Sequence, residues 1–142
     1  GHPVAEIYLA ADATDANVFC YIEDVAPDGT VYYVTQGMLN AKCRKVSDPE
    51  GYIFPGPFHS YKREDALPLE PGQVVKYEFA LMPISYQFKP GHKMRVSIAG
   101  VDIDHFDRLE DKPTAFNVQF NEQYPSKVTV PIIPGQSTST AR

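Results

Sequence analysis

Apolar and polar residues alternate with a period of two along most of this 142-residue chain, and no other feature constrains its fold as strongly. Thirteen prolines and nine glycines are spread over the whole sequence, so the alternating segments are short and joined by turns. No segment has a helical period. The chain is therefore predicted to be all-β, with strands at residues 4–10, 18–25, 31–35, 74–81, 93–100, 116–120 and 127–133.

The clearest turn is Pro27-Asp28-Gly29-Thr30, in which proline fixes φ and glycine accepts the positive φ of a tight turn. It joins the second and third predicted strands in a hairpin whose register places Cys20 near Gly37. Cys20 is then several positions short of Cys43, so we expect two free thiols. Free thiols favour a cytoplasmic setting.

Regular spacing of strands and turns is typical of an antiparallel β-sandwich. A jelly-roll sandwich has eight strands. The seven strands predicted here therefore suit a jelly roll that lacks its first strand. We assign this domain to residues 1–134 and predict a flexible tail over the Ser/Thr-rich residues 135–142.

Residues 41–72 form a long excursion between strands, in which charged residues alternate with proline and glycine. Loops of this length in compact domains usually have a function or pack against something. This one also contains aromatic side chains, which we do not expect to be wholly solvated. They are Tyr52, Phe54, Phe58, His59 and Tyr61.

Charge and hydropathy exclude some partners. The net charge is −5, the pI is near 5.3 and no basic stripe is present, so nucleic acid is not an expected partner. No apolar run approaches the ~20 residues of a membrane helix. The start, residues 1–4, lacks the features of a signal peptide and is interpreted as a fragment boundary, which leaves the native compartment open.

We find no pattern for nucleophilic catalysis. The chain has no Gly-x-Ser-x-Gly elbow, and Ser97 and Ser126 fall in a strand and a turn. The four histidines do not have a zinc spacing. We therefore predict no catalytic residue, no metal site and no cofactor.

An acidic segment near the C-terminal third allows three interpretations. It contains Asp102, Asp104, His105, Asp107, Glu110 and Asp111. Its start is similar to a calcium loop, but Phe106 occupies the fifth position and no glycine follows. The simplest interpretation is a solvated loop with Arg108 and Lys112 as counter-charges. Calcium binding and a role in an interface remain the alternatives.

A carbohydrate-binding module is a second function consistent with a β-sandwich. Such modules present flat aromatic platforms, often tryptophan, and this chain has no tryptophan. Most of its nine tyrosines and eight phenylalanines fall at strand positions where core packing explains them. A free-standing sugar-binding module is therefore the alternative function.

Several stretches in this order resemble one known family. They are residues 19–25 with Pro27-Asp28-Gly29 and 33–37, residues 60–65 with 68–72, residues 88–100 with Asp102 and Phe106, and residues 124–128. Together, over about residues 3–133, they resemble the C-terminal domain of the X-Pro dipeptidyl-peptidase and CocE/NonD hydrolases. The stretches identify this family only when they are taken together, in this order and spacing.

The resemblance implies a galactose-binding-domain-like jelly roll attached to an α/β-hydrolase domain. In that family the catalytic serine, aspartate and histidine lie in the hydrolase domain, so no catalytic residue is carried over to this chain. The parent is then expected to be a serine hydrolase, whether peptidase (with dipeptidyl-peptidase activity), esterase or acylase. The implied partner is the catalytic domain of the same parent chain.

Two segments are our candidates for contact with that domain. The first contains Tyr52, Phe54, Phe58 and Tyr61. The second contains Asp102, His105, Phe106 and Arg108. Because the predicted sandwich has an exposed sheet edge, we also expect that copies of the chain can pair through it as a homo-oligomer.

Overall fold

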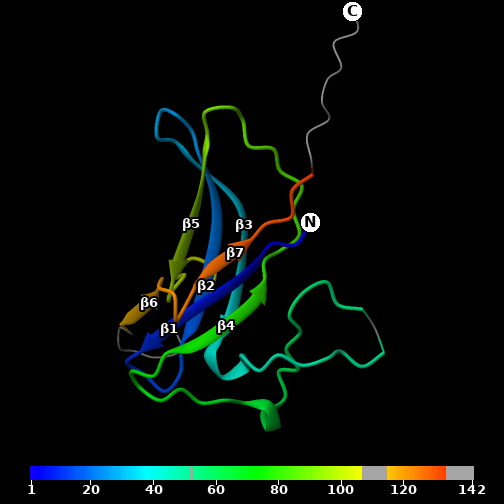
Figure 1. Cartoon of the computed structure of the whole chain (residues 1–142), viewed down its shortest axis with the longest axis vertical. Coiled ribbons are helices and arrows are strands. Elements are labelled where there is room, and N and C mark those ends of the chain that lie inside the picture. The colour runs from blue at the N-terminus through cyan, green and yellow to red at the C-terminus, as the bar shows by residue number, and fades with distance from the viewer. Residues whose placement is uncertain (52, 107–114, 134–142) are drawn as a thin grey trace, which may run out of the picture.

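The computed structural model describes residues 1–51, 53–106 and 115–133, and these residues form two antiparallel sheets (Figure 1). The described part holds seven strands and two helical turns of three residues each, η1 (Ala41–Cys43) and η2 (Arg63–Asp65). The predicted all-β sandwich is confirmed. The jelly-roll subtype and the missing first strand stay predictions, and the predicted tail lies outside the described residues.

Sheet A is built around strand β1 (Val4–Ala11). Strand β4 (Val75–Ala80) pairs with one edge of β1. On the other edge, β7 (Lys127–Thr129) pairs with the first half of β1, and β6 (Phe116–Gln119) pairs with the second half. Two short strands far along the chain thus share one edge of β1.

Sheet B has the order β3-β2-β5, with β2 (Asn17–Val25) between β3 (Val31–Asn40) and β5 (Lys93–Ala99). The central place of β2 explains its apolar residues on both faces. Cys20 lies opposite Gly37, as the turn chemistry predicted, and both cysteines are free. Burial raises the pKa of the Cys20 thiol to about 11.

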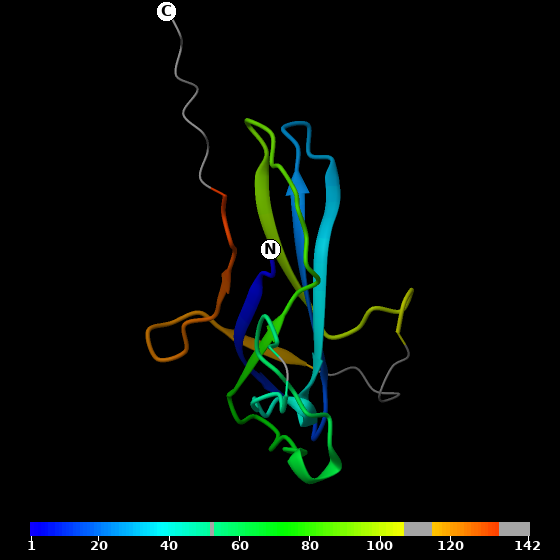
Figure 2. The ribbon, with the colours of Figure 1, turned by 90° about the vertical axis from the view of Figure 1, so that its right-hand side faces the viewer.

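The core lies between the two sheets, which Figure 2 shows from the side. All seven strands of the described part contribute apolar side chains to it, although β5 contributes only Ile98. The largest fully buried side chains include Ile7 and Leu9 from β1, Val18 and Ile22 from β2, and Tyr77 from β4. At 25 cal/mol per Å², burial of each such side chain contributes about 1.5–3 kcal/mol.

The segment that follows β4 ties the two sheets together. The amide of Leu81 donates to the carbonyl of Pro3 beside sheet A, and the amide of Met82 donates to the carbonyl of Gln36 in sheet B, each at 2.8 Å. Gly37 allows this approach, because a Cβ there would lie 2.8 Å from the carbonyl oxygen of Ala80. Strand β3 therefore continues to Asn40, and the prediction that it ends at 35 was wrong.

The last strand prediction also needs correction. Strand β7 ends at Thr129 instead of 133, and Pro131, which has no N–H for a ladder, follows closely. Met94 and Val96 of β5 point to the inner face with their partners Asp24 and Ile22, but they are 50% and 40% exposed. Strand β5 is an edge strand of sheet B, so its inner face is only partly covered.

Neither helical turn in the described part of the chain is long and apolar enough to cross a membrane.

Tyr77 gives a test of the core. Its ring is fully buried, and its hydroxyl has no hydrogen-bond partner among the described residues. Replacing Tyr77 with Phe removes a hydroxyl that is buried without a compensating hydrogen bond. We therefore expect the free energy of unfolding to stay the same or rise by about 1 kcal/mol. Urea denaturation measures it.

The matched control is Tyr86→Phe. The Tyr86 hydroxyl donates to the buried carboxylate of Asp24 at 2.7 Å, so its loss is expected to cost about 1–3 kcal/mol. A Tyr77→Phe variant destabilised as much as the control would contradict this account of the core.

Candidate docking interface

The aromatic segment forms one wall of an open groove. Phe54, Phe58 and Tyr61 line it together with Met38 of β3, and the groove has a volume of about 310 Å³. The side chain of Phe54 is 42% exposed and that of Tyr61 is 67% exposed. Tyr52, the fourth predicted member, lies outside the described residues. The described aromatic side chains of this segment are therefore not buried in the core of the domain.

Short-range bonds shape this segment, which runs along the lower right in Figure 1. The amide of Ser47 donates to the carbonyl of Phe58 at 2.9 Å and folds the segment back on itself. The hydroxyl of Ser60 donates to Asp65, which also pairs with Lys45. Tyr61 has a φ of 54°, a left-handed conformation that costs a non-glycine residue energy and is held by its surroundings.

The second candidate segment folds over the outer face of sheet B. The hydroxyl of Tyr21 donates to the Asp102 carboxylate at 2.7 Å, and the Nδ1 atom of His105 lies 2.9 Å from the same carboxylate. The ring of Phe106 packs against that of Phe19, with centroids 5.1 Å apart. Arg108 lies outside the described residues.

These contacts shift the pKa of each group involved. The hydrogen bonds from Tyr21 and then from His105 lower the pKa of Asp102. The hydrogen bond to Asp102 raises the pKa of His105. Burial, followed by the hydrogen bond to Asp102, raises the pKa of Tyr21.

The two candidate segments meet at sheet B. Phe19 and Met38 are cross-strand partners on its outer face. Phe106 covers Phe19, and Met38 lines the groove. The structure thus brings the two predicted sets to neighbouring positions on the same sheet, although they are far apart in the sequence.

A third polar cluster escaped sequence analysis. Asp24 is 2% exposed, and its carboxylate accepts hydrogen bonds from the Tyr86 hydroxyl and from Nδ1 of His92, at 2.7 and 2.9 Å. The signal was present, because Asp24 continues the core-facing alternation of Val18, Cys20 and Ile22. A carboxylate at such a position implies buried partners.

This cluster joins the β2–β3 turn to the connection between β4 and β5. It lies beside an open hollow of about 540 Å³ that is also lined by Asp28, Tyr32 and Lys89. The carboxylate–imidazole pair is of a kind found in hydrolytic sites, but no serine, threonine or cysteine of the described residues lines the hollow. The hydrogen bond to Asp24 raises the pKa of Tyr86. The geometry assigns the cluster to holding the two turns together.

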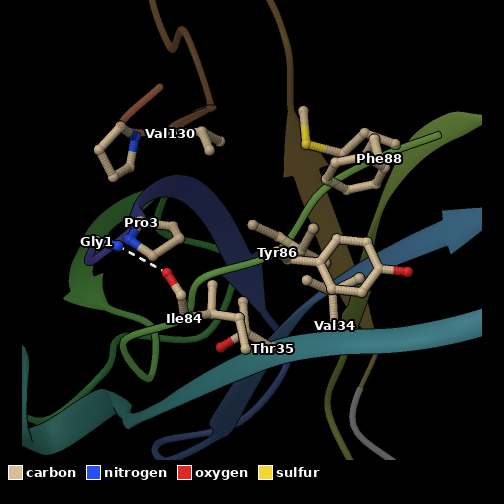
Figure 3. A pocket seen from close by; sticks show the side chains of 11 residues that line it. Gly1, Pro3, Val34, Thr35, Ile84, Tyr86, Phe88 and Val130 are labelled. Carbon is tan, nitrogen blue, oxygen red and sulfur yellow. Dashed lines mark hydrogen bonds between the residues drawn. The ribbon is translucent and has the colours of Figure 1, made fainter. Parts of the chain in front are cut away.

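A small apolar cavity lies at the open end of the sandwich (Figure 3). Val34, Ile84, Phe88 and Val130 are among its lining residues, and its volume is about 70 Å³. The terminal amine of Gly1 donates to the Ile84 carbonyl at its rim, at 2.7 Å. Ligand pockets have volumes of about 300–1,000 Å³, so this gap in the packing is too small for one.

Two further observations concern chemistry within residues 1–51, 53–106 and 115–133. No serine hydroxyl there is hydrogen-bonded to a histidine ring, and Ser97 donates to Glu23 instead. No group of three or more histidine, cysteine or acidic side chains there could hold a metal ion. The calcium interpretation of the acidic segment involves Asp107, Glu110 and Asp111, which lie outside these ranges.

Comparison with known proteins decides the family. The model of the X-Pro dipeptidyl-peptidase C-terminal non-catalytic domain matches residues 1–129. The chain belongs to this family. The resemblance found in the sequence is thus confirmed, and the chain is a C-terminal domain of this group of hydrolases.

Relatives of this non-catalytic domain are parts of much longer proteins. The chain is 37% identical over 134 residues to a protein of Mycobacterium bovis whose name assigns it provisionally to the serine esterases, covering 94% of the chain and 21% of that protein. It is 22% identical over 142 residues to a cocaine esterase of a Rhodococcus species, covering 91% of the chain and 22% of that protein. It spans about a fifth of their length.

Solved structures share the fold of the domain. Two crystal structures of a CocE/NonD family hydrolase from Staphylococcus aureus superpose with TM-scores of 0.76 and 0.73, at 21% and 20% identity. They cover 94% and 90% of this chain, and 28% and 27% of those chains. The β-sandwich is therefore the fold of one part of a larger hydrolase.

The attachment of residues 101–106 should depend on pH. Because the pKa of Asp102 is lowered on folding, its carboxylate stabilises the attached segment at pH values above the usual aspartate pKa, and this stabilisation is lost as the pH falls. Because the pKa of His105 is raised, its imidazolium stabilises the attached segment at pH values below the usual histidine pKa, and this stabilisation is lost as the pH rises. Attachment should be strongest between about pH 4 and pH 6.5.

NMR contacts between the rings of Phe106 and Phe19, followed against pH, measure this attachment. His105→Gln should remove the dependence on the alkaline side, and Asp102→Asn should remove it on the acid side. Ring contacts that stay constant from pH 3 to pH 8 would rule out a role for this pair.

Proposed function

We propose that this domain supports a serine hydrolase by packing against the α/β-hydrolase catalytic domain of the same parent chain. The observation that carries this proposal is the aromatic groove, in which Phe54, Phe58, Tyr61 and Met38 are gathered but left accessible. Contiguous apolar surface of this kind is costly in water and marks contact sites. Aromatic side chains supply much of the binding energy at such sites.

The segment around Asp102, His105 and Phe106 is proposed as a second part of the same contact. Its anchors, Tyr21 and Phe19, lie on the outer face of sheet B next to Met38. Beyond these anchors it presents Ile103, which is 70% exposed. An apolar tip held in place by a hydrogen bond and a ring contact is suited to dock with little loss of conformational entropy.

Ester hydrolysis is the proposed activity of the parent. Both named sequence relatives have names that assign them to the esterases, one of them provisionally, and this favours ester hydrolysis over the peptidase and acylase alternatives. On this proposal the nucleophile, the base and the oxyanion hole belong to the catalytic domain. The β-sandwich contributes by fixing the position of that domain's pocket and by covering one of its sides.

The exposed edge of β5 supports two further parts of the proposal. Met94 and Val96 point to the inner face but are half exposed, and β5 pairs with β2 along one edge only. A further strand of a jelly roll would cover them. Pairing of two copies through the same edge would make a homo-oligomer, which sedimentation of the parent protein can detect.

Substitutions in the groove of the parent protein test the docking proposal. Phe54→Ser and Tyr61→Ser remove apolar contacts, and we expect each to weaken association of the two domains by about 1–3 kcal/mol. The readout is the half-life of esterase activity at a temperature near inactivation, which should shorten several-fold. KM should change less, because the substituted residues lie outside the catalytic machinery.

Ile53→Ser is the matched control. Ile53 lies in the same segment and is 96% exposed, but it does not line the groove. It should leave the half-life unchanged. If all three variants behave alike, the groove is not the docking surface.

The assignment of chemistry to the parent has its own test. The isolated 142-residue chain should not hydrolyse a p-nitrophenyl ester above the buffer rate, while the parent protein should. Turnover by the isolated chain that is abolished by a serine-directed inhibitor would overturn the non-catalytic role.

A further inference from the structure

His59 lies at the base of the aromatic groove, with its residue 6% exposed. Its Nδ1 atom is 3.0 Å from the carbonyl oxygen of Lys45, and its Nε2 atom is 2.9 Å from the carbonyl oxygen of Glu78. Lys45 belongs to the long excursion, and Glu78 belongs to β4, an edge strand of sheet A. The imidazole ring therefore bridges the aromatic segment and the sandwich.

The chemistry of these two contacts fixes the protonation state that they require. A carbonyl oxygen can only accept a hydrogen bond. A neutral imidazole has one N–H and an imidazolium has two, so both contacts are hydrogen bonds only when both ring nitrogens carry a proton. We infer that His59 is a proton-operated clamp, which holds residues 53–61 on β4 in its imidazolium form.

The surroundings of the ring are compatible with a buried cation. Asp65 is paired with Lys45, and Glu78 is paired with Lys76, which also reaches Glu6. The ring of Tyr61 stands edge-on to the imidazole, at a centroid distance of 6.1 Å. These charged side chains form ion pairs with one another. The groups in contact with the ring nitrogens are the carbonyl oxygens of Lys45 and Glu78.

Loss of the proton would release the clamp. One of the two carbonyl oxygens would then have no donor, and a buried acceptor without a partner is costly. Histidine side chains in general change charge between about pH 5 and pH 8. Because both carbonyl oxygens bind the imidazolium form, the closed clamp is stabilised at low pH, and this stabilisation is lost as the pH rises.

The consequence reaches the groove, because His59 lies between Phe58 and Tyr61 in the chain. Releasing the ring would loosen the wall that these aromatic side chains form. This part of the inference rests on the proposed docking function, which makes the same wall the contact with the catalytic domain. His59 is a positioning residue in this account, and it would make that contact sensitive to pH.

The protonation of the ring can be read directly. In the 142-residue chain labelled with ¹⁵N-histidine, long-range proton–nitrogen NMR spectra distinguish protonated from bare ring nitrogens. We expect both nitrogens of His59 to be protonated at pH 5, the state in which both contacts are hydrogen bonds. A single protonated nitrogen at that pH would overturn the inference.

Two variants test whether the proton controls the segment. His59→Gln keeps a donor but cannot titrate, so the amide signals of Phe58 and Tyr61 should lose their dependence on pH between 5 and 8. The released population should be about tenfold larger than in the natural chain at the acid end, as one lost hydrogen bond predicts. Persistent pH dependence in this variant would overturn the inference.

His105→Gln is the matched control, because His105 is exposed and belongs to the other candidate segment, where it contacts Asp102. It should leave the pH response of Phe58 and Tyr61 intact, and loss of that response would count against the clamp. If His59→Gln does not fold, the protonation of His59 in the natural chain decides by itself. These spectra use the 142-residue chain alone, so they test the clamp independently of the docking function. If the spectra show the clamp but Tyr61→Ser does not shorten the half-life of the parent protein, only the docking function is rejected.

Discussion

The backbone of residues 81–82 is the connection on which the two-sheet arrangement depends. Leu81 donates to Pro3 beside sheet A, Met82 donates to Gln36 of sheet B, and the carbonyl of Met82 accepts from the Thr35 hydroxyl at 2.7 Å. These bonds fix the separation and angle of the sheets at one side, so the inner side chains can interdigitate there. At the opposite side, where β5 is the edge, no such bond joins the sheets among the described residues, and the inner face is half exposed at Met94 and Val96.

The apolar side chains form two groups. Those between the sheets, such as Leu39, Phe79 and Leu81, are buried in the core and stabilise the domain itself. Those of the long excursion, such as Phe54 and Tyr61, line the groove beside the core and remain accessible. A domain that spans about a fifth of its relatives' length would be expected to keep some apolar surface for the remainder of the protein.

Local features of the sequence predicted the strands and the sandwich well, because period-two alternation and the Pro27–Thr30 turn act over a few residues. Sequence reasoning failed where distant segments meet. It ended β3 too early because only the approach of Ala80 and Leu81 explains Gly37. It missed the bridge made by the ring of His59, whose nitrogen atoms contact the carbonyl oxygens of residue 45 and residue 78. It proposed both interface segments but could not show that they meet at Phe19 and Met38.

The two segments should not respond equally to a rise in pH, although each contains a histidine. When His105 loses its proton, the Tyr21 hydroxyl can still donate to Asp102, so the ring contact of Phe106 with Phe19 should weaken without being lost. At His59, loss of the proton would break one of the two hydrogen bonds of the proposed clamp, which reach Lys45 and Glu78. The groove is therefore the part of the proposed interface that would loosen first, while the Asp102 segment would keep its place on sheet B.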